Sequence, residues 1–283
     1  MGKFKIFILN LSLKKIYNFF FLSDFKKTGY FYHLRNLYFE FLTSKFPELD
    51  KKEFEKSISE LIINAKNQNN DITDLLYNAF EPNFKNNLNN YYKLFEKQIF
   101  FRFLEYSINK KLIQKKYSDV YNFAINELNE PLEILEIGGG LCHGLIFNIW
   151  KKGKKFFKNL TYLEADMLHA EFITWYCHQN SIPLDKRIFP ASKTPSIKDI
   201  NYNFVFAKDI FEHLDQPENL IEELMINTKN KKTLLCLDLE HKGAYSTQHI
   251  SPNLPILKKI LIDNNYQVIK KFEEVHVWQK INF

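Results

Sequence analysis

The chain has few cysteines and no long apolar run. The cysteines are odd in number, widely spaced and without a Cys-x-x-Cys pair: Cys142, Cys177 and Cys236. We therefore expect neither a disulfide framework nor a structural zinc site, and a reducing, cytoplasmic location fits. The apolar run at residues 6–13 ends at Lys14 and Lys15, so it is too short to span a bilayer. No small-residue cleavage site follows it, so we expect no transmembrane segment and no signal peptide.

The composition is that of a folded globular protein, and its charge is uneven. Hydrophobic residues make up 45% of the 283 residues and charged residues 25%. The net charge of +6 divides into +8 for residues 1–116 and −2 for residues 117–283. The basic part is either a solvated helix surface or an attractor for a phosphorylated or nucleotide-linked molecule or a membrane surface.

The two parts also differ in periodicity. Residues 1–116 show apolar residues at helical spacing and almost no strand pattern, as in the series Phe31, Leu34, Tyr38, Leu42. We expect a helical domain over residues 1–116, serving as a lid or acceptor platform and offering a surface for a homodimer. Residues 117–283 alternate short apolar runs with amphipathic segments and form the second predicted domain.

The alternation after residue 117 predicts an α/β fold, with a doubly wound, mostly parallel seven-stranded sheet covered on both faces. Two consecutive strands at the end predict an antiparallel hairpin at the sheet edge. The expected strands are 132–137, 160–164, 187–189, 204–207, 233–238, 266–272 and 274–280, and the expected helices are 117–128, 141–152, 167–179, 217–227 and 254–264.

The first expected strand runs through Glu136 into three consecutive glycines, Gly138, Gly139 and Gly140. Glycines let the backbone approach a ligand and adopt positive φ, and a helix N-terminus supplies free N–H groups. This order therefore predicts a pocket for a nucleotide-like cofactor. The dinucleotide spacing would need glycine where His143 stands, and no Gly-Lys-Ser/Thr follows for a phosphate loop. An NAD(P)-dependent oxidoreductase remains a weaker alternative.

Three elements together resemble the class I S-adenosylmethionine-dependent methyltransferases, over about residues 120–283. The first is the acidic-x-Gly-x-Gly turn at 136–140, although Cys142 stands where the family often has a further glycine. The second is an acidic residue that closes the second strand, Glu164. The third is Glu212-His213-Leu214 after the fourth strand, which resembles the small-molecule branch of the family.

The resemblance implies a set of cofactor contacts. Glu164 would accept hydrogen bonds from the ribose diol, and Glu136 would lie near the ammonium group of the methionine end. The backbone of Gly138, Gly139 and Gly140 would lie close against the cofactor. The other implied cofactor-binding positions are Ala165, Ser192 and Lys208.

The candidate catalytic residues are His213, His249 and Asp209. Methyl transfer from a sulfonium mainly requires positioning of the acceptor, and a hydroxyl acceptor benefits from a general base, for which histidine has a suitable pKa. We expect His213 to open the helix after the fourth strand and His249 to lie in a loop after the fifth. No metal ligand is predicted, with a carboxylate site at Asp238, Glu240 and His241 as the alternative.

The expected reaction is methyl transfer to a small-molecule acceptor, with oxygen favoured over nitrogen. A sugar, or a nucleotide-linked or phosphate-linked metabolite, would suit the basic N-terminal part. The Asn/Asp-Pro-Pro-Tyr pattern of nucleic-acid amino-methyltransferases is absent after residue 207, and no RNA-binding module is visible, so we expect no nucleic-acid partner. The competing hypothesis is a non-catalytic scaffold that keeps the fold and binds the cofactor.

Overall fold

The computed structural model describes residues 29–45, 47, 50–52, 115–165, 167–228, 232–239, 254–272 and 275–281. The described residues up to 52 and those from 115 onward belong to two compact units. Among these residues, no helix is long and apolar enough to cross a membrane.

Helix α2 (Tyr30–Lys45) is the longest element among the described residues of the N-terminal unit. The side chains of Leu34, Tyr38 and Leu42 are fully buried, as their i, i+4, i+8 spacing predicts for one face of a helix. The helical pattern predicted further along, from Phe54 onward, lies outside the described residues.

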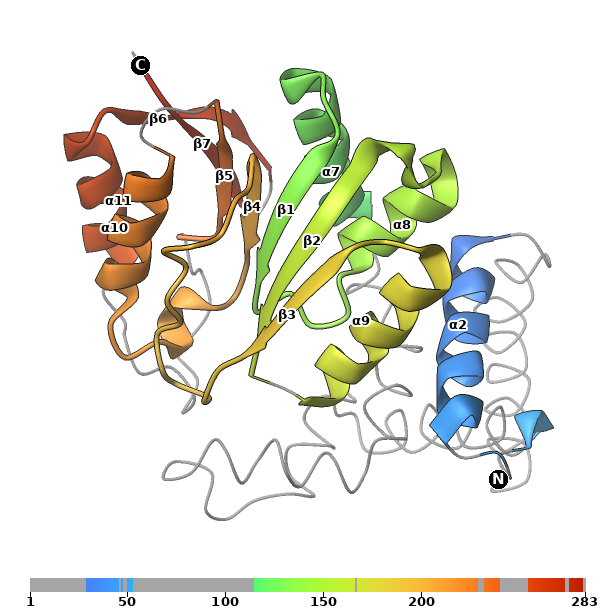
Figure 1. Ribbon diagram of the computed structural model, residues 1–283. Helices are drawn as coiled ribbons and strands as arrows, with labels where there is room; N and C mark the ends of the chain where they lie inside the picture. Colours follow the sequence, from blue (N-terminus) through green and yellow to red (C-terminus); the bar gives the residue numbers. More distant parts are fainter. Residues whose placement is uncertain are drawn as a thin grey trace, which may run out of the picture. The chain divides into compact units, whose positions relative to one another are not determined.

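The second unit contains a seven-stranded sheet in the order β3-β2-β1-β4-β5-β7-β6 (Figure 1). All neighbouring pairs from β3 to β5 are parallel, and β7 is antiparallel to both β5 and β6. The strands are β1 (Leu132–Ile137), β2 (Phe157–Glu164), β3 (Leu184–Ile188), β4 (Phe204–Ala207), β5 (Leu234–Leu237), β6 (Tyr266–Lys271) and β7 (His276–Lys280). The predicted doubly wound, mostly parallel sheet is confirmed.

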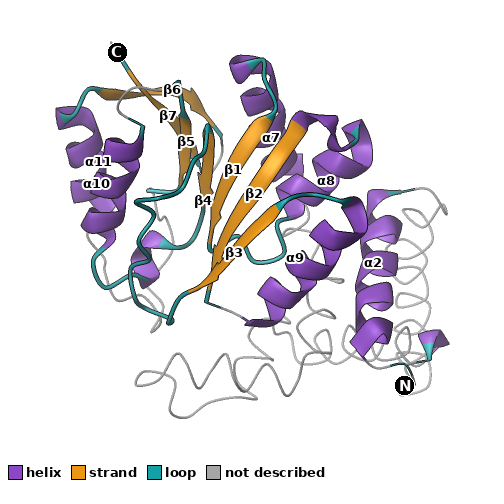
Figure 2. Cartoon of the chain, in the orientation of Figure 1, coloured by secondary structure: helices purple, strands orange, loops and turns teal. Residues whose placement is uncertain are grey.

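Helices cover both faces of this sheet (Figure 2). One face carries α7 (Lys115–Leu128), α8 (His143–Lys152) and α9 (Met167–Asn180), and the other carries α10 (Pro217–Asn227) and α11 (Leu254–Asp263). The fully buried strands β4 and β5 consist of apolar residues and one cysteine, as expected for parallel strands covered on both sides.

Residues that alternate along β1 separate the two faces. Leu135 and Ile137 belong to the buried cluster that includes side chains of α10 and α11. Glu136 points to the opposite face, where it is in register with Tyr162 of β2 and Phe206 of β4. On that face the ring of Tyr121, from α7, contacts Phe206 with centroids 5.8 Å apart. Glu136 therefore lies beneath α7, inside the protein.

The predicted bounds of β1, β4 and α10 agree with the structure, and other bounds shift. Helix α8 begins two residues later than predicted, at His143, because its N-cap residue Cys142 has a left-handed backbone. Strand β2 begins three residues earlier, at Phe157. His213 does not open a long helix: it ends the short 3-10 helix η4 (Phe211–His213), and α10 starts at Pro217.

The order in which the chain adds strands across the sheet reverses at β1, although β1 and β4 themselves are parallel. From β1 the chain proceeds outward to β2 and β3, and it then returns to place β4 on the other side of β1. The carboxyl ends of β1, β2 and β4 therefore meet at one edge of the sheet, at a topological switch point. The glycine turn, Glu164 and the segment from Lys208 onward all leave the sheet at this edge.

Candidate cofactor and active site

The glycine turn after β1 uses its glycines for two physical reasons. Gly138 has φ +63°, and a Cβ there would lie 2.8 Å from Cδ1 of Ile210, so both the backbone and the space require glycine. A Cβ on Gly139 would lie 2.2 Å from Cγ of Glu136. The turn is thus packed against the segment after β4 on one side and against the Glu136 side chain on the other.

Cys142 ends the glycine turn and caps helix α8. Its φ of 47° and ψ of 46° are left-handed, a conformation that costs a non-glycine residue roughly 1–2 kcal/mol. Its thiol forms a hydrogen bond to Glu136, which is a contact that glycine could not make.

Glu136 is a buried carboxyl group with protein partners. The residue is only 2% exposed, and the hydroxyl of Tyr121 donates a short hydrogen bond to its Oε2. Burial, and to a smaller extent the charge of Glu164, raise the pKa of Glu136, and the hydrogen bonds from Tyr121 and Cys142 lower it; the net result is a pKa of about 8. The protonated form is thereby favoured near neutral pH.

Glu164 ends β2 and is held against the glycine turn by backbone donors. The N–H of Gly140 donates to Oε2 at 3.0 Å, and the N–H of Ala165 donates to Oε1 at 2.8 Å. The Tyr162 hydroxyl lies 2.9 Å from Oε2 and 2.5 Å from the carbonyl oxygen of Gly140. These contacts fix the orientation of an acceptor-rich carboxylate at the carboxyl edge of the sheet.

The segment after β4 brings further predicted residues beside the glycine turn. Ile210 packs against Gly138, so its neighbours lie close to the turn. The Lys208 ammonium group forms a short ion pair with Asp209, whose φ of 49° is left-handed. Non-glycine residues in this conformation are strained and cluster at functional sites. His213 lies three residues after Ile210, and its backbone N–H donates to the carbonyl oxygen of Ile210.

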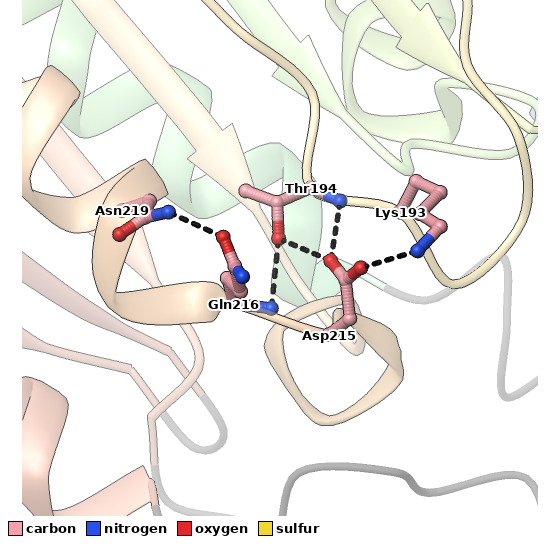
Figure 3. A network of polar contacts seen from close by, with 5 residues as sticks. All are labelled: Lys193, Thr194, Asp215, Gln216 and Asn219. Atoms are coloured by element: carbon pink, nitrogen blue, oxygen red, sulfur yellow. Dashed lines mark hydrogen bonds and ion pairs between the residues drawn. The ribbon is translucent and has the colours of Figure 1, made fainter.

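The loop after β3 is tied to the loop after β4 (Figure 3). The backbone N–H of Asp215 donates to the carbonyl oxygen of Ser192 at 2.9 Å. Its carboxylate accepts hydrogen bonds from Lys193 Nζ at 2.9 Å and from the N–H and hydroxyl of Thr194 at 2.9 and 3.0 Å. The Lys193 ammonium group holds the pKa of Asp215 below its usual value. The turn at residues 191–193, called the Ser192 turn below, is therefore fixed at the same edge of the sheet.

The structure thus brings most of the predicted site residues together at one edge. His249, with Glu240 and His241 of the alternative metal site, lies outside the described residues. Asp238 is buried just after β5. In the described part of the chain, no three His, Cys, Asp or Glu side chains form a group that could hold a metal ion.

Tyr121, Tyr162 and Ile210 are site residues that the sequence patterns did not indicate. Tyr162 stands two residues before Glu164, so a rule that strand side chains at i and i+2 share a face could have selected it. Tyr121 and Ile210 reach the site from α7 and from the loop after β4, and no spacing in the sequence relates them to Glu136 or Gly138.

No family model and no curated protein matches the chain. Three of the similar solved structures have TM-scores of 0.38–0.40. A SAM-dependent methyltransferase from Aquifex aeolicus is 16% identical, over 60% of this chain and 95% of that one (TM-score 0.39). A 1,6-didemethyltoxoflavin-N1-methyltransferase from Burkholderia thailandensis, solved with S-adenosylhomocysteine, is 9% identical over 62% and 80% (0.40). The 16S rRNA methylase ArmA is 12% identical over 59% and 83% (0.38). At these values the case for a function rests on the site itself.

Proposed function

We propose that the chain binds S-adenosylmethionine at the carboxyl edge of the sheet and transfers its methyl group to a small-molecule acceptor. The observation that carries this proposal is the placement of Glu164. Two backbone N–H groups, of Gly140 and Ala165, hold its carboxylate beside the glycine turn at the switch point between β1 and β4. A fixed carboxylate at this place suits the adjacent hydroxyls of a ribose.

The remaining residues take roles that follow from their positions. Gly138 and Gly139 keep the turn free of side chains, so that the backbone can lie close to the cofactor. Glu136 supports this turn from inside the protein, where its side chain packs against Gly139. The Ser192 turn, fixed by Asp215, would border the adenine side.

S-Adenosylmethionine supplies a methyl group on a sulfonium centre, which is activated for in-line displacement. The protein then has to hold the acceptor in line and remove its proton. Asp209, just after the carboxyl end of β4, would orient or deprotonate an acceptor, and its carboxylate forms an ion pair with the Lys208 ammonium group. His213 and His249 remain the histidine candidates for a general base.

For the acceptor we propose a hydroxyl group of a sugar, or of a nucleotide-linked or phosphate-linked metabolite. The support is the charge of +8 on residues 1–116, which would attract an anionic molecule. A cytoplasmic location and a homodimer formed through the N-terminal helices belong to the same proposal. A mass-spectrometric screen of metabolite extracts should yield a product heavier by one methylene. Binding of the cofactor without any such product would favour the non-catalytic scaffold.

The cofactor itself is tested by calorimetric titration of the full chain with S-adenosylmethionine. We expect saturable binding by wild type, and a 10- to 100-fold weaker affinity for Glu164→Gln, since charge-assisted hydrogen bonds to the ribose are worth roughly 1.5–3 kcal/mol each. Glu133→Gln is the matched control, because Glu133 lies on β1 in an exposed ion pair with Lys158. Binding of NAD in place of S-adenosylmethionine would favour the oxidoreductase alternative.

A further inference from the structure

The hydroxyl of Tyr162 lies between two acceptors that belong to different parts of the site. It is 2.5 Å from the carbonyl oxygen of Gly140 and 2.9 Å from Oε2 of Glu164. A phenolic hydroxyl has a single proton, so it can donate to only one of these oxygens at a time. Tyr162 is fully buried, so its hydroxyl would be costly to leave without a hydrogen bond.

Two donors lie within hydrogen-bond distance of Oε2 of Glu164. The N–H of Gly140 donates to it at 3.0 Å, and the Tyr162 hydroxyl competes for the same oxygen. A carboxylate oxygen offers about two lone-pair sites. When the Tyr162 proton lies on Oε2, a ligand hydroxyl that donates to this oxygen must displace it. The nearby carbonyl oxygen of Gly140 gives that proton another acceptor, so no buried O–H is left unpaired.

We propose that Tyr162 is a specificity-determining residue that pairs with Glu164 whenever a ligand hydroxyl does not. On binding of a vicinal diol, the Tyr162 O–H rotates from Oε2 to the carbonyl oxygen of Gly140, and no covalent bond forms or breaks. With a ligand that lacks this hydroxyl, the Tyr162 O–H stays on Oε2 and the carboxylate keeps its donor. The inference rests on the proposed function, because it takes the ribose of the cofactor as the diol.

The proposal predicts an unequal response to the two missing hydroxyls in wild type. S-Adenosylhomocysteine and its 2′-deoxy and 3′-deoxy forms serve as probes in calorimetric titrations. The deoxy form that lacks the hydroxyl facing Oε2 should lose about tenfold less affinity than the other, since Tyr162 replaces the missing donor. Equal losses for both deoxy forms would overturn the role of Tyr162, and this measurement needs no variant.

Removal of the phenolic hydroxyl should restore the full penalty. In Tyr162→Phe the carboxylate loses a donor that it cannot regain when the ligand hydroxyl is missing. We expect the affinity for the tolerated deoxy form to fall about tenfold further relative to S-adenosylhomocysteine. A merely structural role for Tyr162 would lower both affinities by the same factor and leave their ratio unchanged, which would refute the proposal.

Tyr266→Phe is the matched control. Tyr266 is also a buried tyrosine, and its hydroxyl bonds to Thr228 at the far edge of the sheet. The ratio of affinities should match that of wild type in this variant. If wild type binds no S-adenosylhomocysteine, the proposed cofactor is wrong; if wild type binds it and the ratio is the same in Tyr162→Phe, only the role of Tyr162 is wrong.

Discussion

The free energy of unfolding of wild type should fall as the pH rises, and we expect replacement of Glu136 by glutamine to abolish this fall. The folded protein binds the proton of Glu136 more tightly than the unfolded chain, because burial raises the pKa of this carboxyl from 4.5 to about 8. Below pH 4.5 the group is protonated in both states. Between pH 4.5 and 8 the unfolded chain releases the proton first, so the free energy of unfolding falls with pH.

The size of this fall follows from the pKa difference. Each pKa unit is worth about 1.4 kcal/mol, so the change from 4.5 to about 8 amounts to about 5 kcal/mol. That is a large part of the roughly 5–15 kcal/mol that stabilises a typical domain. Glutamine resembles the protonated acid: it still offers Tyr121 a carbonyl acceptor, and it has no charge to bury at any pH.

The assay is urea unfolding of both proteins at pH values from 5 to 9, with the free energy extrapolated to water. Glu136→Gln should gain stability relative to wild type with rising pH, by up to about 5 kcal/mol near pH 8 and above. Glu133→Gln, at the one partly exposed position of the same strand, should follow the wild-type pH dependence. If the free energies of unfolding of wild type and Glu136→Gln run parallel over this range, the pKa of Glu136 is not raised by burial.

Three further variants test the packing and charges of the site. Gly139→Ala should lower the free energy of unfolding by about 3 kcal/mol, because the new Cβ meets the Glu136 side chain. In a Glu136→Ala background the same substitution should cost less, and additive losses in the double-mutant cycle would contradict this contact. Asp215→Ala should speed hydrogen exchange of the backbone amides around Ser192 without affecting those of β1. Because the pKa of Asp215 is lowered in the folded protein, the stabilisation that its carboxylate gives is present at neutral pH and lost in acid. Burial lowers the pKa of His143 to about 3, so wild type should lose stability as the pH falls below 6.5; His143→Gln should lack that loss, and identical acid unfolding of the two proteins would contradict it.

Local patterns were sufficient to predict the elements that meet at the site. The apolar runs of β1 and β4 and the proline at the start of α10 define those elements from neighbouring residues alone. The start of β2 escaped prediction, because Lys158 is exposed and interrupts the apolar run. Helix α8 starts late because Cys142 is left-handed, which no residue preference of cysteine indicates.

The side-chain environment of the glycine turn could not be predicted in the same way. The strand-end position of Glu136 predicts a contact with the methionine end of the cofactor, but it does not predict that the Glu136 side chain lies beneath Tyr121 on the covered face of β1. Its raised pKa depends on which helix covers that face, and this is a property of tertiary packing. Glu164 differs because its environment is made by adjacent backbone, the N–H groups of Ala165 and of the glycine turn.

A crystal structure of the full chain with S-adenosylhomocysteine would show whether Glu164 and the glycine turn hold the cofactor, as we propose. We expect the ribose hydroxyls within about 2.6–3.2 Å of the Glu164 carboxylate oxygens, with the backbone of Gly138, Gly139 and Gly140 against the ligand. A ligand bound elsewhere, or a ribose with no contact to Glu164, would contradict it.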